Sequence, residues 1–179
     1  MPEVVSQVEL RLAQPEDVAN IADLLTRTFY QHPGWRSLLS PIFKLGLCYD
    51  LATRLQIPAP DKYQCWIAEI PHPTQANLKP LVGTVEVGLR SLSLASLFNP
   101  TQAYISNLAV DQDHRRQGIA RQLIFKCEAA AQTWTRDDIF LHVRSDNAIA
   151  LSLYEQLGYR LSSQRSPIDL SRQLMAKKI

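Results

Sequence analysis

Several features are scarce in this 179-residue chain, and each absence excludes a class of protein. No apolar run approaches the ~20 residues that a membrane span needs, and no charged head followed by an apolar stretch marks a secretory signal. The net charge is only +2, so no general attraction to nucleic acid or to a membrane surface is expected. With 46% hydrophobic and 20% charged residues, the composition predicts a soluble globular protein.

Cysteine is also scarce. Cys48, Cys65 and Cys127 form an odd and unclustered set, which predicts free thiols in a reducing compartment and a cytoplasmic location. A disulfide framework is therefore not expected. His32 and His72 lie far from any matching cysteine or aspartate spacing, so no metal site is expected either.

The N-terminal region predicts a short strand followed by a helix. Pro15 suits the first helical position, and Glu16 and Asp17 suit the positive end of the helix dipole. Apolar residues then recur at helical spacing, namely Val18, Ile21, Leu25 and Phe29. No linker, repeat or low-complexity stretch follows, so we interpret residues 1–179 as one domain.

A second helix is predicted over residues 37–56, before Pro58 and Pro60. It carries two apolar stripes, one of Leu38, Ile42, Leu45 and Tyr49 and the other of Leu39, Phe43, Leu47 and Leu51. A helix that is apolar on two sides is usually packed between other elements. Core or dimer packing is the favoured interpretation, and an acyl or substrate wall is the alternative.

Residues 63–70 and 81–90 predict two strands joined by a proline-rich polar loop. One face of the second strand carries Leu81, Gly83, Val85, Val87 and Leu89. Glu86 lies on the other face, where an exposed strand carboxylate is the simplest interpretation. Residues 91–102 are ambiguous, with a turn predicted at Asn99-Pro100.

The rest of the chain predicts a strand-helix-strand-helix unit. The strands cover residues 103–110 and 138–144, and such a crossover makes them parallel neighbours. The first helix has an apolar face made of Ile119, Ala120, Leu123, Ile124, Cys127, Ala130 and Trp134. Asp146 or Asn147 caps the second helix, and Gly158 follows its end. Short strands near 159–164 and 170–176 complete the pattern.

The turn between these elements concentrates features that bind anions. Gly118 opens the first helix, whose leading N–H groups have no intrahelical partners and carry the positive end of the dipole. Arg115, Arg116 and Arg121 add cationic side chains. Neither GxxxxGK[ST] nor GxGxxG occurs in the chain. The turn therefore indicates a polyphosphate site of another kind, with a capped helix and solvated arginines as the alternative.

Two motifs here resemble those of the GNAT superfamily, the Gcn5-related N-acetyltransferases. Arg115-x-x-Gly118-x-Ala120 is similar to the acetyl-CoA pyrophosphate signature of that superfamily. A second signature follows in the same order as in the superfamily, and it comprises Asn147, Ala148, Ala150, Tyr154, Gly158 and Tyr159. The strong similarity covers residues 103–160.

The resemblance implies an α/β (α+β) GNAT fold. That fold is a single mixed, mostly antiparallel sheet of about seven strands flanked by about four helices, with a splayed parallel central pair at 103–110 and 138–144. The pantetheine arm of acetyl-CoA would pair with the backbone of Leu108, Ala109 and Val110. The pyrophosphate would lie beside Arg115 on the N–H groups of Arg116, Gln117, Gly118, Ile119, Ala120 and Arg121. Asn147 would also contact the pantetheine or diphosphate.

An acceptor amine must lose a proton before it attacks a thioester, so a base with a pKa near neutrality is useful. His142 and Tyr104 lie on the predicted neighbouring strands, where they can converge and hold a water. Some N-terminal protein acetyltransferases of the superfamily have similar strands and use this pair as a water-mediated general base. Glu86 is the fallback base. The alternative is a hydrogen-bonded strand histidine beside a core tyrosine.

By the same resemblance, Tyr154 would donate a proton to the departing CoA thiolate. The N–H of Leu108 would stabilise the oxyanion of the intermediate. The resemblance implies direct transfer with no acyl-enzyme, and Cys127 is expected to belong to the core.

The function implied is an N-acetyltransferase that moves acetyl from acetyl-CoA to a primary amine, with a protein N-terminal α-amine or a lysine ε-amine favoured. Residues 165–174 lack a tyrosine pair that grips peptide in such relatives. A small-molecule amine (a polyamine, an amino acid or an antibiotic) is therefore the alternative acceptor. A non-catalytic acyl-CoA sensor is the alternative function. We expect a monomer or homodimer with no nucleic-acid, membrane or metal partner.

Overall fold

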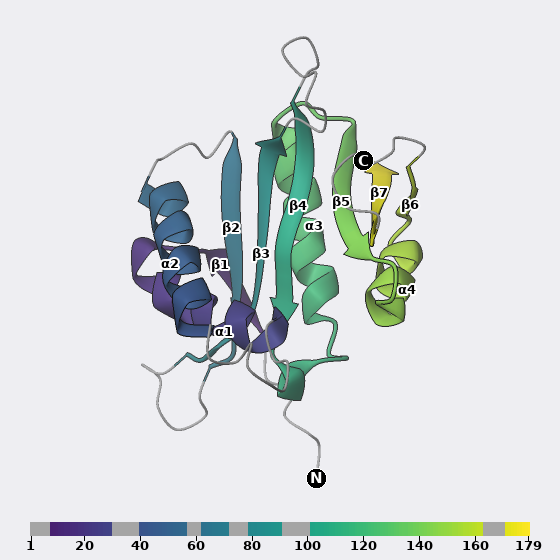
Figure 1. Ribbon diagram of the computed structural model, residues 1–179. Coiled ribbons are helices and arrows are strands. Elements are labelled where there is room, and N and C mark those ends of the chain that lie inside the picture. Colours follow the sequence, from purple (N-terminus) through teal and green to yellow (C-terminus); the bar gives the residue numbers. More distant parts are fainter. Residues whose placement is uncertain (1–7, 30–39, 57–61, 72–78, 91–100, 163–170) are drawn as a thin grey trace. The chain divides into compact units, whose positions relative to one another are not determined.

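The structure is a computed structural model that describes residues 8–29, 40–56, 62–71, 79–90, 101–162 and 171–179, without the side chains of 40–43. Its seven strands are β1 (Glu9–Leu12), β2 (Tyr63–Glu69), β3 (Leu81–Arg90), β4 (Gln102–Val110), β5 (Asp138–Arg144), β6 (Arg160–Leu161) and β7 (Arg172–Lys178). They form a sheet in the order β1-β2-β3-β4-β5-β7-β6 (Figure 1). The chain divides into two compact units, and the strands β2, β3 and β4 each have residues in both.

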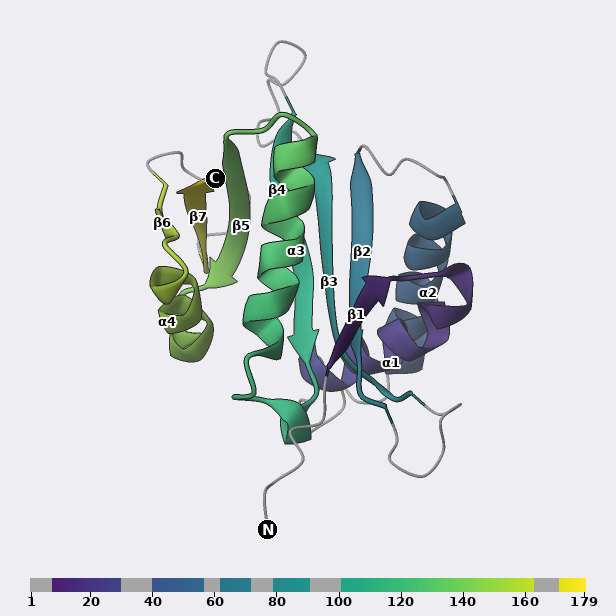
Figure 2. The same cartoon turned by 180° about the vertical axis from the view of Figure 1, so that it is seen from behind.

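The first unit contains β1, β2 from Cys65 onward and two helices, α1 (Val18–Phe29) and α2 (Ser40–Gln56). β1 pairs antiparallel with β2, with Leu12 opposite Trp66. α1 and α2 lie side by side in Figures 1 and 2 and are in contact. Pro15 begins a short 3-10 turn that leads into α1, as predicted. The core of this unit includes Ile21, Ala22, Leu24, Leu25, Leu51, Ile67 and Ala68.

A partly buried ionic cluster connects elements at the start of the first unit. The Arg11 guanidinium donates hydrogen bonds of 2.7 and 2.9 Å to Asp17 and of 3.1 and 2.7 Å to Glu69. The Gln14 N–H also donates to Asp17, at 2.7 Å. Asp17 thus caps the helical turn as its position predicts, and it also joins that turn to β1 and β2 through Arg11.

The two apolar stripes predicted for α2 differ in burial. Leu51 is fully buried, whereas Leu45 is 72% exposed and Tyr49 is 77% exposed. Core packing therefore does not account for Leu45 and Tyr49 within the described part of the chain, and dimer packing of this stripe stays a prediction. Periodicity identifies an apolar stripe, but it does not identify what covers the stripe.

The second unit contains β5, β6, β7 and α4 (Ala148–Gln156), with most of α3 (Ile119–Thr133). β4 and β5 are parallel, with Tyr104 opposite Phe140, and β7 pairs antiparallel with both β5 and β6. The predicted parallel neighbours and the predicted strand at 138–144 are confirmed. Every apolar position predicted for the α3 face is buried except Ala120, which is partly buried.

β3 is buried on both faces, which corrects the interpretation of Glu86. This residue is 1% exposed, and its Oε2 accepts a 2.9 Å hydrogen bond from the Tyr63 hydroxyl. Val82 and Thr84, which alternate with the apolar face in the same way as Glu86, are buried too. Glu86 is therefore not an exposed strand carboxylate.

Some predictions fall outside the described residues, among them the turn at Asn99-Pro100, His32 and His72. All three cysteines are free thiols, and Cys127 is buried in the core as expected. Among the helices that the structure describes, none is long and apolar enough to span a bilayer.

Candidate active site

The polar turn after β4 is fixed to its neighbours within the first unit. The Asp111 N–H donates to the Val82 carbonyl oxygen at 2.8 Å, and the Asp111 carboxylate accepts from the Asp113 N–H and forms a 3.2 Å ion pair with Arg27. The start of α3 also approaches β3 closely at Gly83, where a Cβ would lie 3.1 Å from Ile119. These contacts hold the helix start in place.

Gly118 leaves this helix start open to the approach of a ligand. Its φ of +80° is one that residues with a Cβ rarely adopt, and no described atom lies within 4 Å of the position a Cβ would take. The first helical hydrogen bond runs from the Gln122 N–H to the Gly118 carbonyl oxygen at 3.1 Å. The N–H groups of Ile119, Ala120 and Arg121 therefore precede the first turn and suit a phosphate group.

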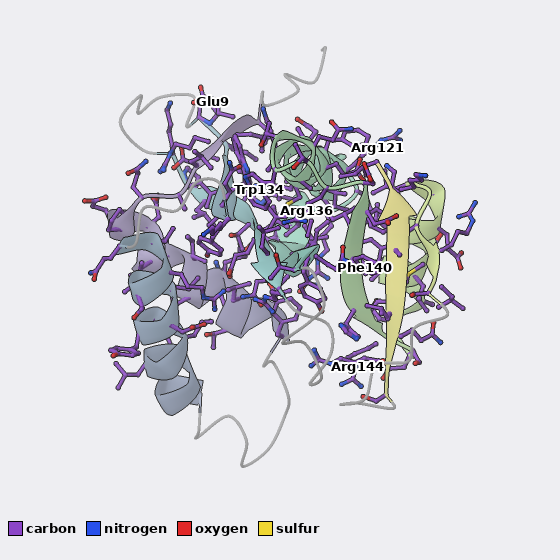
Figure 3. All side chains as sticks on the ribbon, turned by 90° about the horizontal axis from the view of Figure 1, so that it is seen from above. Glu9, Arg121, Trp134, Arg136, Phe140 and Arg144 are labelled. Carbon is purple, nitrogen blue, oxygen red and sulfur yellow. The ribbon has the colours of Figure 1, made fainter. Side chains whose placement is uncertain are left out.

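The arginines of the turn have different positions. Arg115 Nε donates to the Val110 carbonyl oxygen at 3.2 Å, so its guanidinium stays at the end of β4. Arg116 has a left-handed backbone, with φ of 63°, and is exposed. Arg121, labelled in Figure 3, is exposed near the start of α3. The residues present therefore fit a pyrophosphate, and their contact with one stays a prediction.

Tyr104 and His142 meet within the second unit. Tyr104 Oη and His142 Nδ1 share a hydrogen bond of 2.6 Å, and their ring centroids are 5.7 Å apart. The pairing of Tyr104 with Phe140 places His142 two residues further along the adjacent strand, on the same face. The convergence predicted from the sequence is present, but the contact is direct, so no water lies between the two atoms.

The surroundings of Tyr104 act on its phenol in opposite directions. Burial raises the pKa of Tyr104, while the positive charges of Arg90 and Arg172 and a hydrogen bond with the His142 backbone act to lower it. The net result is a pKa above the ordinary value, so Tyr104 is a neutral phenol near pH 7. The guanidinium of Arg90 lies over the Tyr104 ring, with 5.0 Å to the ring centroid. The sequence did not identify Arg90, because its own strand contains no signal for this contact with another strand.

Tyr154 lies on α4 and is 7% exposed. Burial raises the pKa of its phenol well above the ordinary value, with smaller contributions from Cys127 and Tyr104. Within the described residues its hydroxyl makes no hydrogen bond, and its ring packs edge-on against Tyr159 at 5.7 Å. A phenol that stays protonated and keeps its proton available suits the predicted role of proton donor.

Three other residues of the second motif, Asn147, Gly158 and Tyr159, make structural contacts near Tyr154, and the predicted contact of Asn147 with the cofactor stays a prediction. Asn147 caps α4 by accepting a 3.1 Å hydrogen bond from the Ala150 N–H, and Gly158 ends the helix with φ of +92°. The Tyr159 hydroxyl donates to Glu128 at 3.0 Å. Glu128 was not identified from the sequence, since its pairing with this tyrosine arises only when α3 and the chain after α4 come together.

Among the described residues, no group of three or more His, Cys, Asp or Glu side chains is arranged to hold a metal ion. His114 is half-buried, with Nδ1 3.4 Å from Asp111.

The mixed sheet with a parallel β4–β5 pair and the glycine-opened helix after β4 are the features that the GNAT fold implies. The chain belongs to the Acetyltransferase (GNAT) family, which matches residues 18–159. The fold implied by the two motifs is thereby confirmed.

The chain is similar to GCN5-related N-acetyltransferase 4, chloroplastic, of Arabidopsis thaliana, with 25% identity over 184 residues that cover 89% of this chain and 62% of that protein. It is also similar to the [Ribosomal protein bS18]-alanine N-acetyltransferase of Escherichia coli K12, with 36% identity over 64 residues, or 36% of this chain and 43% of that protein. The chain thus spans less than two thirds of the length of these curated relatives.

Among solved structures, the PaiA N-acetyltransferase of Thermoplasma acidophilum, in complex with coenzyme A, superposes with a TM-score of 0.73. The match covers 97% of this chain and 99% of that chain at 15% identity. At this identity the likeness shows a shared fold.

Proposed function

We propose that this chain is an N-acetyltransferase that transfers acetyl from acetyl-CoA directly to a primary amine of a protein, either an N-terminal α-amine or a lysine ε-amine. The observation that carries the proposal is the 2.6 Å hydrogen bond between Tyr104 and His142 in a chain of the GNAT family. The pair supplies a polar, partly buried group that can receive the proton of an acceptor ammonium.

Acetyl-CoA is proposed to bind through its pyrophosphate to the helix start opened by Gly118. The fit rests on the glycine conformation, the open space around it and the N–H groups of Ile119, Ala120 and Arg121. Backbone groups of residues 108–110 would pair with the pantetheine arm, and Asn147 would contact it. The PaiA enzyme with the same fold was solved with coenzyme A, which supports this choice of ligand.

The proposed reaction replaces the carbon–sulfur bond of the thioester by a carbon–nitrogen bond and moves one proton from nitrogen to sulfur. The acceptor nitrogen gives a proton to the Tyr104–His142 pair, through a water beside it, and forms a bond to the thioester carbonyl carbon. The carbon–sulfur bond then breaks, and Tyr154 donates its proton to the CoA thiolate. The Leu108 N–H would stabilise the developing oxyanion.

The preference for a protein amine is supported by the similarity to a bacterial enzyme whose name specifies alanine N-acetylation of ribosomal protein bS18. The test is mass spectrometry of peptides and intact proteins incubated with acetyl-CoA, which separates α- from ε-acetylation. Free CoA thiol is measured in parallel with a panel of small amines. Acetylation of polyamines alone would refute the proposal that the acceptor is a protein. Binding of acetyl-CoA without turnover on any amine would favour the alternative, a non-catalytic acyl-CoA sensor.

A further inference from the structure

Two tyrosines of the second motif, Tyr154 and Tyr159, are joined where α4 ends. The helix stops at Gly158, whose φ of +92° turns the chain back toward the helix. The Tyr159 N–H then donates a 3.0 Å hydrogen bond to the Tyr154 carbonyl oxygen. The turn also brings the two rings together, with centroids 5.7 Å apart and an interplanar angle of 63°. Such an edge-on contact is a favourable geometry for two aromatic rings.

Packing, and not a hydrogen bond, fixes the Tyr154 hydroxyl within the described part of the chain. The side chain is buried, and its hydroxyl has no hydrogen-bond partner among the described residues. A phenolic oxygen at the tip of a rigid ring moves whenever the ring tilts. The position of this oxygen therefore depends on what holds the ring, and the ring of Tyr159 lies directly against it.

Tyr159 is itself held at its far end. It is fully buried, and its hydroxyl donates a 3.0 Å hydrogen bond to Glu128 Oε1. Burial and the Glu128 carboxylate raise the pKa of the Tyr159 phenol far above its ordinary value, so the phenol stays protonated and keeps donating. The same carboxylate accepts hydrogen bonds of 2.9 and 2.8 Å from Lys177 Nζ. Because Glu128 belongs to α3 and Lys177 to β7, the Tyr159 ring is tied to two elements outside α4.

Lys177 reaches Glu128 by passing beside Gly158. A Cβ on Gly158 would lie 3.7 Å from Lys177 Cε and 3.9 Å from Cδ, which is ordinary contact distance. The Lys177 Nζ lies 5.7 Å from the centroid of the Tyr159 ring, within the range of a cation–π contact. The side chains of Lys177 and Glu128 are only 22% and 12% exposed, so salt screens this pair less than a surface pair.

We propose that the Glu128–Lys177 pair positions Tyr154 for proton transfer through the ring of Tyr159, which the pair anchors. This inference rests on the proposed function and adds a positioning network behind its proton donor. The network moves no proton and touches no reacting atom. A catalytic group displaced by about 1 Å can lose about 10²-fold in rate, so a loosened ring should slow the reaction measurably.

The test removes the anchor and measures kcat and KM separately. Tyr159→Phe keeps the ring and loses the hydrogen bond to Glu128, and Glu128→Leu removes the acceptor. Each variant should lower kcat about tenfold and leave the KM for acetyl-CoA unchanged. Asp17→Asn is the matched control, because Asp17 is also a buried carboxylate that accepts hydrogen bonds from a cation, Arg11, but it lies in the turn before α1. The control should lose stability and keep its kcat.

A second background shows whether the loss of rate passes through Tyr154. In Tyr154→Phe, which lacks the hydroxyl, Tyr159→Phe and Glu128→Leu should lower kcat no further. A general weakening of the fold would lower kcat by the same factor in both backgrounds. Equal losses in the two backgrounds therefore overturn the inference and leave the acetyltransferase in place. An unchanged kcat in Tyr159→Phe overturns it too, and this variant decides the test if Glu128→Leu does not fold.

A measurement without turnover separates this inference from the proposed function. NMR of protein with ¹³C-labelled tyrosine rings reports the flip rate of the Tyr154 ring, whose signal is identified by its loss in Tyr154→Phe. The rate should rise in Tyr159→Phe and in Glu128→Leu and equal that of the parent in Asp17→Asn. A higher rate without turnover of any amine would support the anchor and refute the proposed reaction. A parent-like rate in both variants would overturn the inference whatever the value of kcat.

Discussion

Tyr104 and His142 are joined directly across the parallel pair of strands by a 2.6 Å hydrogen bond. Because the two groups share one proton, they act as a unit, and removing either one disables the other. We predict that Tyr104→Phe and His142→Ala each lower kcat, on the order of 10²-fold for a general base. The double variant should lose little more than either single variant.

The measurement is a double-mutant cycle on kcat, with acetyl-CoA affinity and thermal stability recorded for all four proteins. Losses that multiply in the double variant would show that the two side chains contribute independently. Such a result would remove the paired base from the mechanism.

Tyr154→Phe should separate catalysis from binding. Burial raises the pKa of the Tyr154 phenol well above its ordinary value, so the phenol keeps its proton across the neutral and mildly alkaline range. Removing the hydroxyl should lower kcat about 10²-fold or more, with the KM for acetyl-CoA unchanged. The parent enzyme should show no loss of activity from ionisation of Tyr154 below about pH 10. Unchanged kcat in the variant would exclude this tyrosine as the proton donor.

The strand-helix-strand-helix part of the fold could be predicted because its signals are local. β5 occupies the predicted residues 138–144, and α4 is capped at Asn147 and ends just before Gly158. Gly118 was identified from the motif around it, and its left-handed backbone gives the physical reason for a glycine there. Each of these features depends on a residue and its immediate neighbours.

Features that depend on distant parts of the chain could not be predicted. Alternation placed Glu86 opposite the apolar face of its strand, but only the assembled sheet buries that second face. The position of Asp17 predicted a helix start, whereas its partner Arg11 is fixed by a second carboxylate 58 residues away in the chain. Arg90 was missed for the same reason, since its neighbour Tyr104 lies on another strand.

Gly118→Ala should weaken acetyl-CoA binding. At φ of +80°, an alanine costs about 1 kcal/mol of conformational strain, and its methyl group would occupy the open space proposed for a phosphate. Gly46→Ala on α2 is the control, because a Cβ there also meets no described atom but the backbone is helical. Calorimetry should detect weaker binding for Gly118→Ala alone. Equal affinities in the two variants would contradict the assignment of this turn.

Tyr159→Phe should reduce stability without changing cofactor affinity. The fully buried Tyr159 donates to Glu128, which also accepts two hydrogen bonds from Lys177 at 2.8 and 2.9 Å. Loss of the hydroxyl should lower the free energy of unfolding by about 1 to 2 kcal/mol. Tyr49→Phe, on an exposed side chain, should have no effect in the same denaturant titration. Equal stabilities of the two variants would mean that the Tyr159–Glu128 contact is not stabilising.

The Arg11–Asp17 pair should make the protein sensitive to acid. Burial alone would raise the pKa of Asp17, but hydrogen bonds from Arg11 and the Gln14 N–H hold it below its ordinary value. A carboxyl whose pKa is lower in the folded state contributes stability above its unfolded pKa and loses it as the pH falls through the folded pKa. This contribution should therefore be complete at pH 7 and decline below about pH 4.

Asp17→Asn removes that titration, so the variant should be less stable than the parent at pH 7, with the difference shrinking toward pH 3. Urea unfolding at pH 7, 5, 4 and 3 measures the free energy of unfolding of the parent and of the variant. Asp50→Asn is the control, because Asp50 forms an exposed pair with Arg54 on α2 and such pairs contribute little. The stability difference between Asp17→Asn and the parent could instead stay constant from pH 7 to pH 3. This result would mean that the carboxylate charge of Asp17 does not stabilise the folded state. In that case the hydrogen-bond geometry, which asparagine partly preserves, would be the stabilising feature.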